Sequence, residues 1–105
     1  MIFRRGRFHD LVERQLDLFE EDQATLLAEA RAADAGWTHA TAEESEERYG
    51  NYQLVVDAVA ELLHDARETY AATLDEATVP EYRAAFDREA RRRLPRFAGL
   101  LDEDD

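Results

Sequence analysis

The stretch that decides the fold is residues 41–74, TAEESEERYGNYQLVVDAVAELLHDARETYAATL. It opens with a capping-box pattern, Thr41-Ala-Glu-Glu44, and it contains no proline. As a single helix it would be about 50 Å long, at ~1.5 Å per residue. A rod of this length needs another long element beside it, in the same chain or in a second copy. Its apolar residues recur at the spacing of one helix face: Tyr49, Tyr52, Val56, Val59, Leu63, Ala66, Tyr70 and Leu74.

A second helical pattern precedes this stretch and predicts a single helix from Phe8 to Ala35. Gly36 suits the left-handed position that ends many helices, and Trp37 would then fold back over the last turn. Because the link from Gly36 to Ala40 is short, we expect the two helices to form an antiparallel hairpin. The apolar face of the first helix consists of Phe8, Val12, Leu16, Phe19, Leu26, Ala30 and Ala33.

A third helix is predicted to begin at Thr78-Val-Pro-Glu81, where the threonine caps the helix and the proline occupies its first turn. Pro95 should end it near Arg93, because a proline ring clashes with the preceding turn of a helix. Residues 97–101 are apolar enough to pack back on the other helices. The acidic residues 102–105 are expected to form a disordered tail.

These patterns together predict an all-α protein: a long antiparallel helical hairpin plus a shorter third helix, with the helical bundle completed by dimerisation. Residues 1–101 would form one helical-bundle domain. The pair Gly50-Asn51 leaves alternatives open, a continuous long helix or one that is kinked or broken at this point. Gln23 and Asp34 fall on the apolar face of the first helix, so we expect their side chains to be hydrogen-bonded at helix–helix contacts.

The composition excludes several classes of function. The chain has 105 residues, a formal net charge of −12 and a pI near 4.6. This charge repels nucleic acids and anionic lipids, so we expect neither as a partner. The absence of cysteine excludes disulfides and thiolate metal sites. No apolar run approaches the ~18 residues of a membrane span, and Met1–Arg7 lacks the apolar segment of a secretory signal. We therefore expect a soluble cytoplasmic protein.

All thirteen basic residues are arginine, which fits either a high-GC genome or adaptation to salt. Three of them, Arg4, Arg5 and Arg7, lie at the N-terminus. A second group lies within residues 88–96 and is called the basic patch here. The two groups would either neutralise acidic faces within the fold or the oligomer, or form a docking surface for an acidic partner. The basic patch consists of Arg88, Arg91, Arg92, Arg93 and Arg96.

The sequence offers one candidate for a metal site, Glu61-Leu-Leu-His64, and it is a weak one. A Glu-x-x-His spacing places a carboxylate and an imidazole on adjacent turns, and ferritin-like di-iron bundles use two such pairs. This chain has one pair, and both side chains project away from the apolar face of the long helix. We therefore predict no bound metal and no cofactor, unless a second copy supplies the missing ligands.

Catalytic chemistry has no further support in the sequence. The single serine, Ser45, lies in a run of glutamates, and no two of the histidines His9, His39 and His64 share a helical i, i+4 spacing. A serine nucleophile needs a histidine base, an orienting carboxylate and an oxyanion hole, and no such arrangement is recognisable. We therefore expect the protein not to be an enzyme.

An interaction surface is the more plausible functional feature, because tyrosine supplies apolar area with a polar rim. We predict a small non-enzymatic helical interaction or assembly module that forms a homodimer. A different protein is a further candidate partner. Two alternatives remain: a ferritin-like metal-binding protein that is competent only as an oligomer, and an acidic decoy that binds a basic partner. The predicted interface consists of Tyr49, Tyr52, Val56, Val59, Leu63 and Tyr70.

Overall fold

The computed structural model describes residues 6–103, and every regular element in that range is a helix. The all-α class predicted from the sequence is therefore confirmed. The molecule is elongated, with principal extents of 54 × 31 × 22 Å. None of the helices within residues 6–103 is long and apolar enough to cross a membrane. The helices are α1 (His9–Asp22), α2 (Ala24–Thr38), α3 (Ser45–Ala71), α4 (Val79–Arg93) and α5 (Pro95–Glu103).

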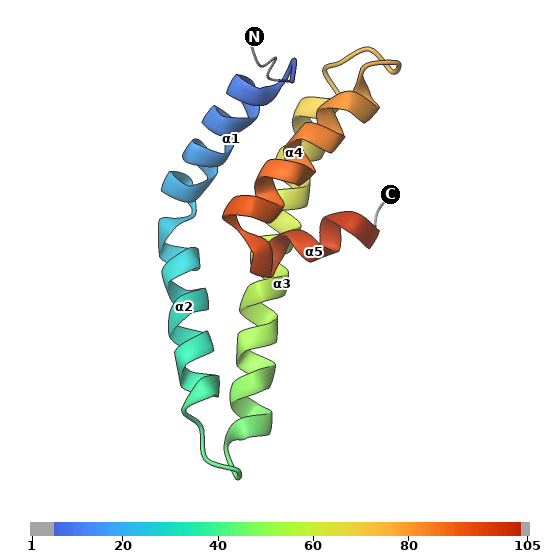
Figure 1. Cartoon of the computed structure of the whole chain (residues 1–105). Helices are drawn as coiled ribbons and strands as arrows, with labels where there is room; N and C mark the ends of the chain where they lie inside the picture. The colour runs from blue at the N-terminus through green and yellow to red at the C-terminus, as the bar shows by residue number, and fades with distance from the viewer. Residues whose placement is uncertain (1–5, 104–105) are drawn as a thin grey trace, which may run out of the picture.

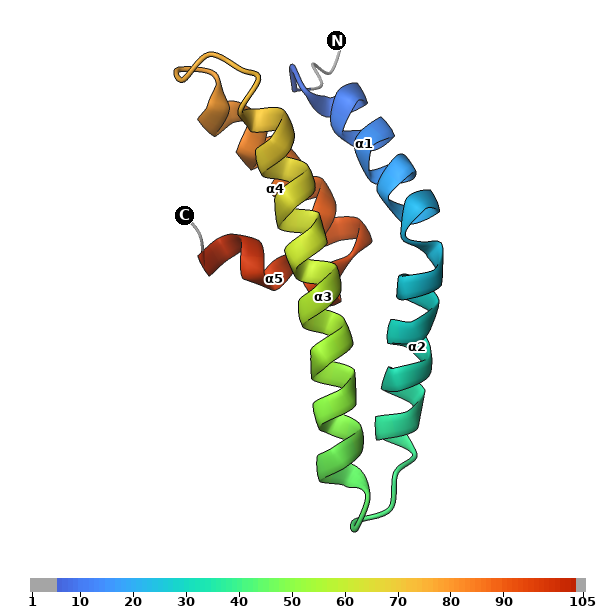
Figure 2. The ribbon, with the colours of Figure 1, turned by 180° about the vertical axis from the view of Figure 1, so that it is seen from behind.

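The helices pack in two zones along the length of α3 (Figures 1 and 2). α2 packs along one half of α3, whereas α1 packs against α4 beside the other half. α5 turns back from the end of α4 and packs against both α3 and α4. Three or more helices therefore surround the core at one end, whereas α2 and α3 continue alone at the other.

The first helix is broken at Gln23, which corrects the prediction of a single helix from Phe8 to Ala35. Gln23 has φ −104° and ψ 21°; its N–H donates to the carbonyl of Phe19, and its own carbonyl accepts the first hydrogen bond of α2. The break follows from packing, because α1 lies against α4 and α2 lies against α3. A straight helix could not follow both partners, so the chain bends where a polar side chain interrupts the apolar face.

The end of α2 also differs from the prediction. Gly36 lies inside the helix rather than in a left-handed cap, and none of the described glycines has a positive φ. The helix continues to Thr38, with the N–H of His39 donating to the carbonyl of Ala35 at 3.1 Å. Trp37 therefore belongs to the last turn of α2, where its ring contacts α3. This contact offsets the cost of about 1 kcal/mol of a glycine within a helix.

α3 is continuous through Gly50, which settles the alternative left open by the sequence in favour of one long helix. It begins at Ser45, one turn later than predicted, because residues 42–44 form a turn. The side chains of Thr41 and Glu44 nevertheless interact: the hydroxyl donates to Glu44 Oε1 at 2.9 Å, and the Glu44 N–H donates to the hydroxyl at 3.3 Å.

The bounds of α4 agree with the sequence, but the predicted side-chain cap does not form. Thr78 occupies the N-cap position without a side-chain cap hydrogen bond, and a proline lies in the first turn. The helix ends at Arg93, Leu94 leaves the helical conformation, and Pro95 opens α5. α5 extends to Glu103 and so includes the first two residues of the predicted tail, whereas residues 104 and 105 lie outside the described range.

The core contains residues from all five helices. Three predicted interface residues, Val56, Val59 and Leu63, are buried in it, and the last two have no exposed surface. They pack in the core of this chain with residues of the other helices. At the end near α4 the ring of Tyr82 packs against Phe8, Tyr70 and Phe86, at centroid distances of 5.5, 5.0 and 6.1 Å.

A buried ion pair joins α3 to α4 and was not anticipated from the sequence. Arg67 Nη1 donates to both carboxylate oxygens of Asp87, at 2.8 and 3.0 Å, and both side chains are almost fully buried. Arg67 Nε donates to Glu68 at 2.9 Å, and Arg83 donates to the same carboxylate. Burial alone would lower the pKa of Arg67, but the hydrogen bonds and charges of Asp87 and Glu68 raise it. No buried side-chain polar atom within residues 6–103 lacks a partner.

Candidate functional site

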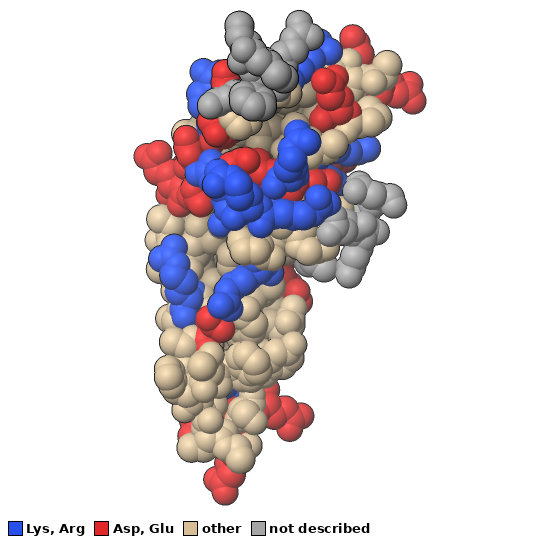
Figure 3. All heavy atoms as spheres, in the orientation of Figure 1, with Lys and Arg blue, Asp and Glu red and all other residues tan. Residues whose placement is uncertain are grey.

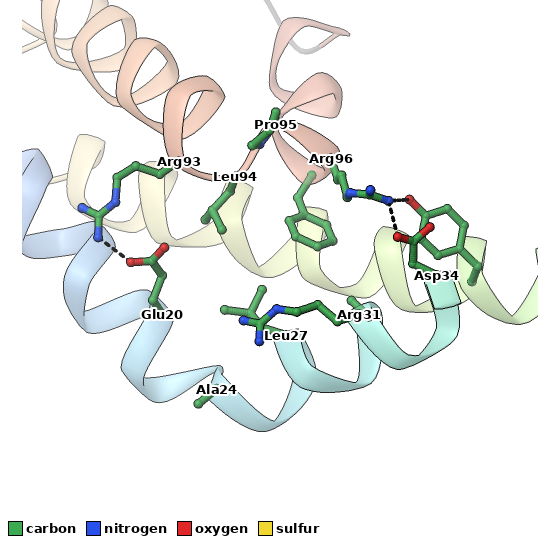
Figure 4. A pocket seen from close by; sticks show the side chains of 12 residues that line it. Glu20, Ala24, Leu27, Arg31, Asp34, Arg93, Leu94, Pro95 and Arg96 are labelled. Carbon is green, nitrogen blue, oxygen red and sulfur yellow. Dashed lines mark hydrogen bonds and ion pairs between the residues drawn. The ribbon is translucent and has the colours of Figure 1, made fainter. Parts of the chain in front are cut away.

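An apolar hollow of about 490 Å³ lies between α2 and the corner where α4 meets α5 (Figure 4). We call it the corner groove. Pro95 shapes it, because the proline follows the end of α4 and redirects the chain so that Leu94 faces Leu27 across the hollow, which Phe97 also lines. The lining residues are Glu20, Ala24, Leu27, Ala30, Arg31, Asp34, Tyr52, Arg93, Leu94, Pro95, Arg96 and Phe97.

An ion-pair cluster closes the end of the corner groove nearest α1. The guanidinium of Arg93 contacts the carboxylates of Asp17, at 2.6 Å, and Glu20, and it also donates to the carbonyl of Glu13 at 3.1 Å. Burial alone would lower the pKa of Arg93, but its hydrogen bonds to the two carboxylates outweigh burial and raise it. Arg93 therefore has a structural role, because its contacts hold α4 against α1.

A second cluster closes the opposite end. Arg96 lies 2.9 Å from a carboxylate oxygen of Asp34, and its Nη1 donates to the hydroxyl oxygen of Tyr52 at 3.1 Å. These contacts raise the pKa of Arg96. The hydrogen bond expected for Asp34 at a helix–helix contact is present, with a partner from α5 that the sequence had not indicated.

Arg31 is the remaining cation of the corner groove. It projects from α2 beside Leu27, between the two closed ends (Figure 4). Within residues 6–103 it has no ion pair or hydrogen bond, and its side chain is exposed. The groove therefore combines an apolar floor with one guanidinium that has no partner in the described part of the chain.

An aromatic cluster adjoins the corner groove through a shared residue, Tyr52. Trp37 stacks on Tyr52 with a centroid distance of 5.9 Å and an interplanar angle of 9°, and it contacts Tyr49 at 5.1 Å. Trp37 is 38% exposed and Tyr49 46% exposed. Tryptophan, tyrosine and arginine are the residues most enriched at the energetic centres of protein interfaces. Of the predicted interface residues, Tyr49 and Tyr52 are placed together here, whereas Tyr70 packs on Tyr82 at the other end of the molecule.

Figure 3 shows a band of arginine side chains across the face that it draws. Acidic side chains border this band, whereas the same face over α2 and the neighbouring part of α3 is largely uncharged. Arg92 donates to Glu89 at 2.9 Å and lowers the pKa of that carboxylate, and Arg93 and Arg96 bind acids of α1 and α2. These three contacts support the view that the patch neutralises acidic faces within the fold.

The predicted weak metal candidates do not form a ligand set. Glu61 is exposed, and His64 Nδ1 lies 3.8 Å from Asp65. The structure brings together a different group in the first turns of α1, His9, Asp10 and Glu13, whose ligand atoms lie within 4.8 Å of one another. His9 and Glu13 have an i, i+4 spacing in the sequence. A search restricted to pairs of histidines does not detect such a histidine–glutamate pair. All three side chains are at least partly exposed on a single helical segment, where such groups are common without an ion.

Comparisons of the chain with protein-family models, curated protein sequences and solved structures found no match. Arg31 and Leu27 were not singled out from the sequence, although Arg31 follows Leu27 by one helical turn in a helix that is otherwise rich in alanine.

Proposed function

We propose that the protein is a non-enzymatic assembly module that forms a homodimer through the free end of an α2–α3 hairpin. The C-terminal half of α2, the link 39–44 and the N-terminal half of α3, residues 32–55, are called the distal arm. The observation that carries the proposal is the exposure of large apolar side chains there: Trp37, Tyr49 and Leu54, the last of them 70% exposed.

The composition of α2 supports a covered outer face. Its fifteen residues include only three charged ones, and within the distal arm its alanines at positions 32 and 35 are exposed. A helix that is apolar on most of its surface is normally buried, and exposed apolar patches frequently mark interaction sites. In a chain with a net charge of −12, so uncharged a helix is a local exception.

The geometry of the distal arm suits pairing with a second copy. Two helices alone leave apolar side chains on both sides of their plane, and Tyr49 and Leu54 lie about 140° apart around α3 at 100° per residue. Packing two such arms together would give a four-helix bundle, the arrangement in which helical pairs usually bury such faces. Trp37 and Tyr49 would then be central contacts.

Sedimentation velocity over a series of protein concentrations tests this proposal. We expect a concentration-dependent dimer, accompanied by a blue shift in the emission of Trp37, the only tryptophan of the chain. Tyr49→Ser should weaken dimerisation, because a buried aromatic at an interface centre is worth about 2 kcal/mol or more. Leu18→Ala is the matched control, because Leu18 is 58% exposed on α1, outside the distal arm.

Two outcomes would contradict the proposal. One is a strict monomer at high micromolar concentration, and the other is a dimer that Tyr49→Ser and Leu18→Ala weaken equally. The ferritin-like and acidic-decoy alternatives are not favoured by a specific observation among the described residues, so neither is proposed.

A further inference from the structure

The corner groove has a feature that the proposed dimer does not use. Leu27, Leu94 and Phe97 are apolar residues that line it. Its two ends are closed by the ion pairs of Arg93 with Glu20 and of Arg96 with Asp34 (Figure 4). It is a short, bounded hollow rather than a channel that runs along a helix.

We propose that the corner groove is a binding site for a small amphipathic carboxylic acid. The aliphatic part of the ligand lies on Leu27 and Phe97, and its carboxylate pairs with the guanidinium of Arg31. This inference goes beyond the proposed dimerisation and does not depend on it, since Arg31 and Phe97 lie outside the distal arm.

The charge pattern argues for an anionic ligand. Of the three arginines that line the groove, Arg93 and Arg96 already bind carboxylates of the chain, whereas Arg31 has no partner within residues 6–103. A guanidinium at the rim of an apolar hollow favours a carboxylate, because it can donate two parallel hydrogen bonds to the two oxygens. A neutral ligand would leave Arg31 as it is, and a cationic one would be repelled by it.

The shape argues for a small molecule rather than a peptide segment. The volume of about 490 Å³ falls within the range of about 300–1,000 Å³ typical of small-molecule sites. A helix or an extended peptide laid in the groove would have to pass over one of the closing ion pairs. The peptide would then either break that ion pair or leave its own backbone N–H and C=O groups without partners above the charged side chains.

Titration of the protein with octanoate, followed by amide chemical shifts, tests the site directly. We expect saturable shifts centred on Leu27, Arg31 and Phe97. Octanol, which has the same chain and no charge, should bind at least several-fold more weakly, and octyltrimethylammonium more weakly still. Equal affinity for octanoate and octanol would overturn the assignment of an anionic ligand.

Matched variants test the charged part and the apolar part of the site separately. Arg31→Gln should weaken octanoate binding roughly fivefold and leave octanol binding unchanged, since one charged hydrogen-bonded pair is lost. Arg14→Gln, at an exposed arginine of α1, is the control for charge. Ala24→Leu should fill the hollow and weaken both ligands, whereas Ala28→Leu, at an exposed position of α2 that does not line the groove, should weaken neither.

Several results would overturn the proposal. These are shifts centred elsewhere, no saturation by octanoate, or equal effects of Arg31→Gln and Arg14→Gln. If the amide chemical shifts of Leu27 and Phe97 change with protein concentration in the absence of ligand, the groove binds a second copy of the chain. If an acidic amphipathic peptide moves these signals and octanoate does not, the groove binds a peptide. Failure here leaves the dimer intact, because dimerisation is measured by sedimentation and perturbed at Tyr49.

Discussion

The two ends of α3 lie in different surroundings. At its C-terminal end α3 packs beside α4, where Arg67 and Asp87 form a buried ion pair and Tyr82 is enclosed by aromatic rings. At its N-terminal end α3 packs mainly along α2, and the aromatic rings of Trp37 and Tyr49 remain partly exposed. The first end, called the body here, satisfies its polar groups internally. The distal arm has contact area left for another molecule.

The largest effect should follow from removing one partner of the ion pair in the body. Asp87→Ala leaves Arg67 buried without its main counter-charge, so we expect the free energy of unfolding to fall by about 3–5 kcal/mol. Urea denaturation measures this loss. The double variant Arg67→Met/Asp87→Leu should recover most of it, because two apolar side chains of similar volume need no counter-charge. A loss below about 1 kcal/mol for Asp87→Ala would show that water or Glu68 compensates the charge.

The next effect concerns pH and the ring of Tyr82. Burial is the main cause that raises the pKa of its hydroxyl from 10.0 to about 12, although the hydrogen bond to Gln15 opposes the change. Because the folded state holds this proton more tightly than the unfolded state, stability is present below pH 10 and falls between about pH 10 and 12. The loss should reach roughly 2–3 kcal/mol.

Denaturation in urea at a series of alkaline pH values measures this slope. Tyr82→Phe should flatten it, whereas Tyr49→Phe, at an exposed ring of the distal arm, should leave it unchanged. Equal slopes for wild type and Tyr82→Phe would contradict the assignment to Tyr82.

A gain in stability is expected in the distal arm. Gly50 lies within α3, its φ is not positive, and a Cβ added there would meet nothing within 4 Å. Gly50→Ala should therefore raise the free energy of unfolding by about 1 kcal/mol, because it removes the cost of a glycine within a helix. Thermal unfolding followed by circular dichroism measures the gain. A destabilised variant would indicate that the arm needs a bend at this position.

The smallest effect is expected at the surface of the basic patch. Arg92→Gln removes a pair between the exposed Arg92 and the partly buried Glu89 of the same helix, so we expect the midpoint of urea unfolding to change only slightly. Arg93→Gln should lower the midpoint, since Arg93 contacts Glu13, Asp17 and Glu20 on α1. If both variants behave alike, the contacts of Arg93 do not hold α4 to α1.

The features predicted correctly from the sequence are those that local residues determine. Pro80 lies in the first turn of α4 and Pro95 follows its end, because the backbone chemistry of proline acts within one turn. The break at Gln23 could not be predicted in this way. The apolar pattern runs through it, and the break exists because α1 and α2 pack against different helices.

The buried ion pair and the corner groove show more clearly what the spacing of residues along the sequence does not predict. Arg67 lies at a helical spacing from Leu63 and Tyr70, so its burial could have been suspected, but its partner Asp87 is twenty residues away in the next helix. The corner groove depends on the angle at which α5 leaves α4 and on the path of α2 after the break. Neither angle is encoded in the spacing of apolar residues, so Arg31 could not be distinguished from any other exposed arginine.

The break at Gln23 also has a consequence for the order in which the chain folds. It divides the N-terminal half between two kinds of partner: α2 joins α3, which follows it after a short link, whereas α1 joins α4, which lies much further along the chain. Contacts between neighbouring segments form first, because closing a longer loop costs more chain entropy. We therefore expect the α2–α3 pair to assemble early and α1 to dock after α4 is in place, so that the N-terminal helix completes the body last.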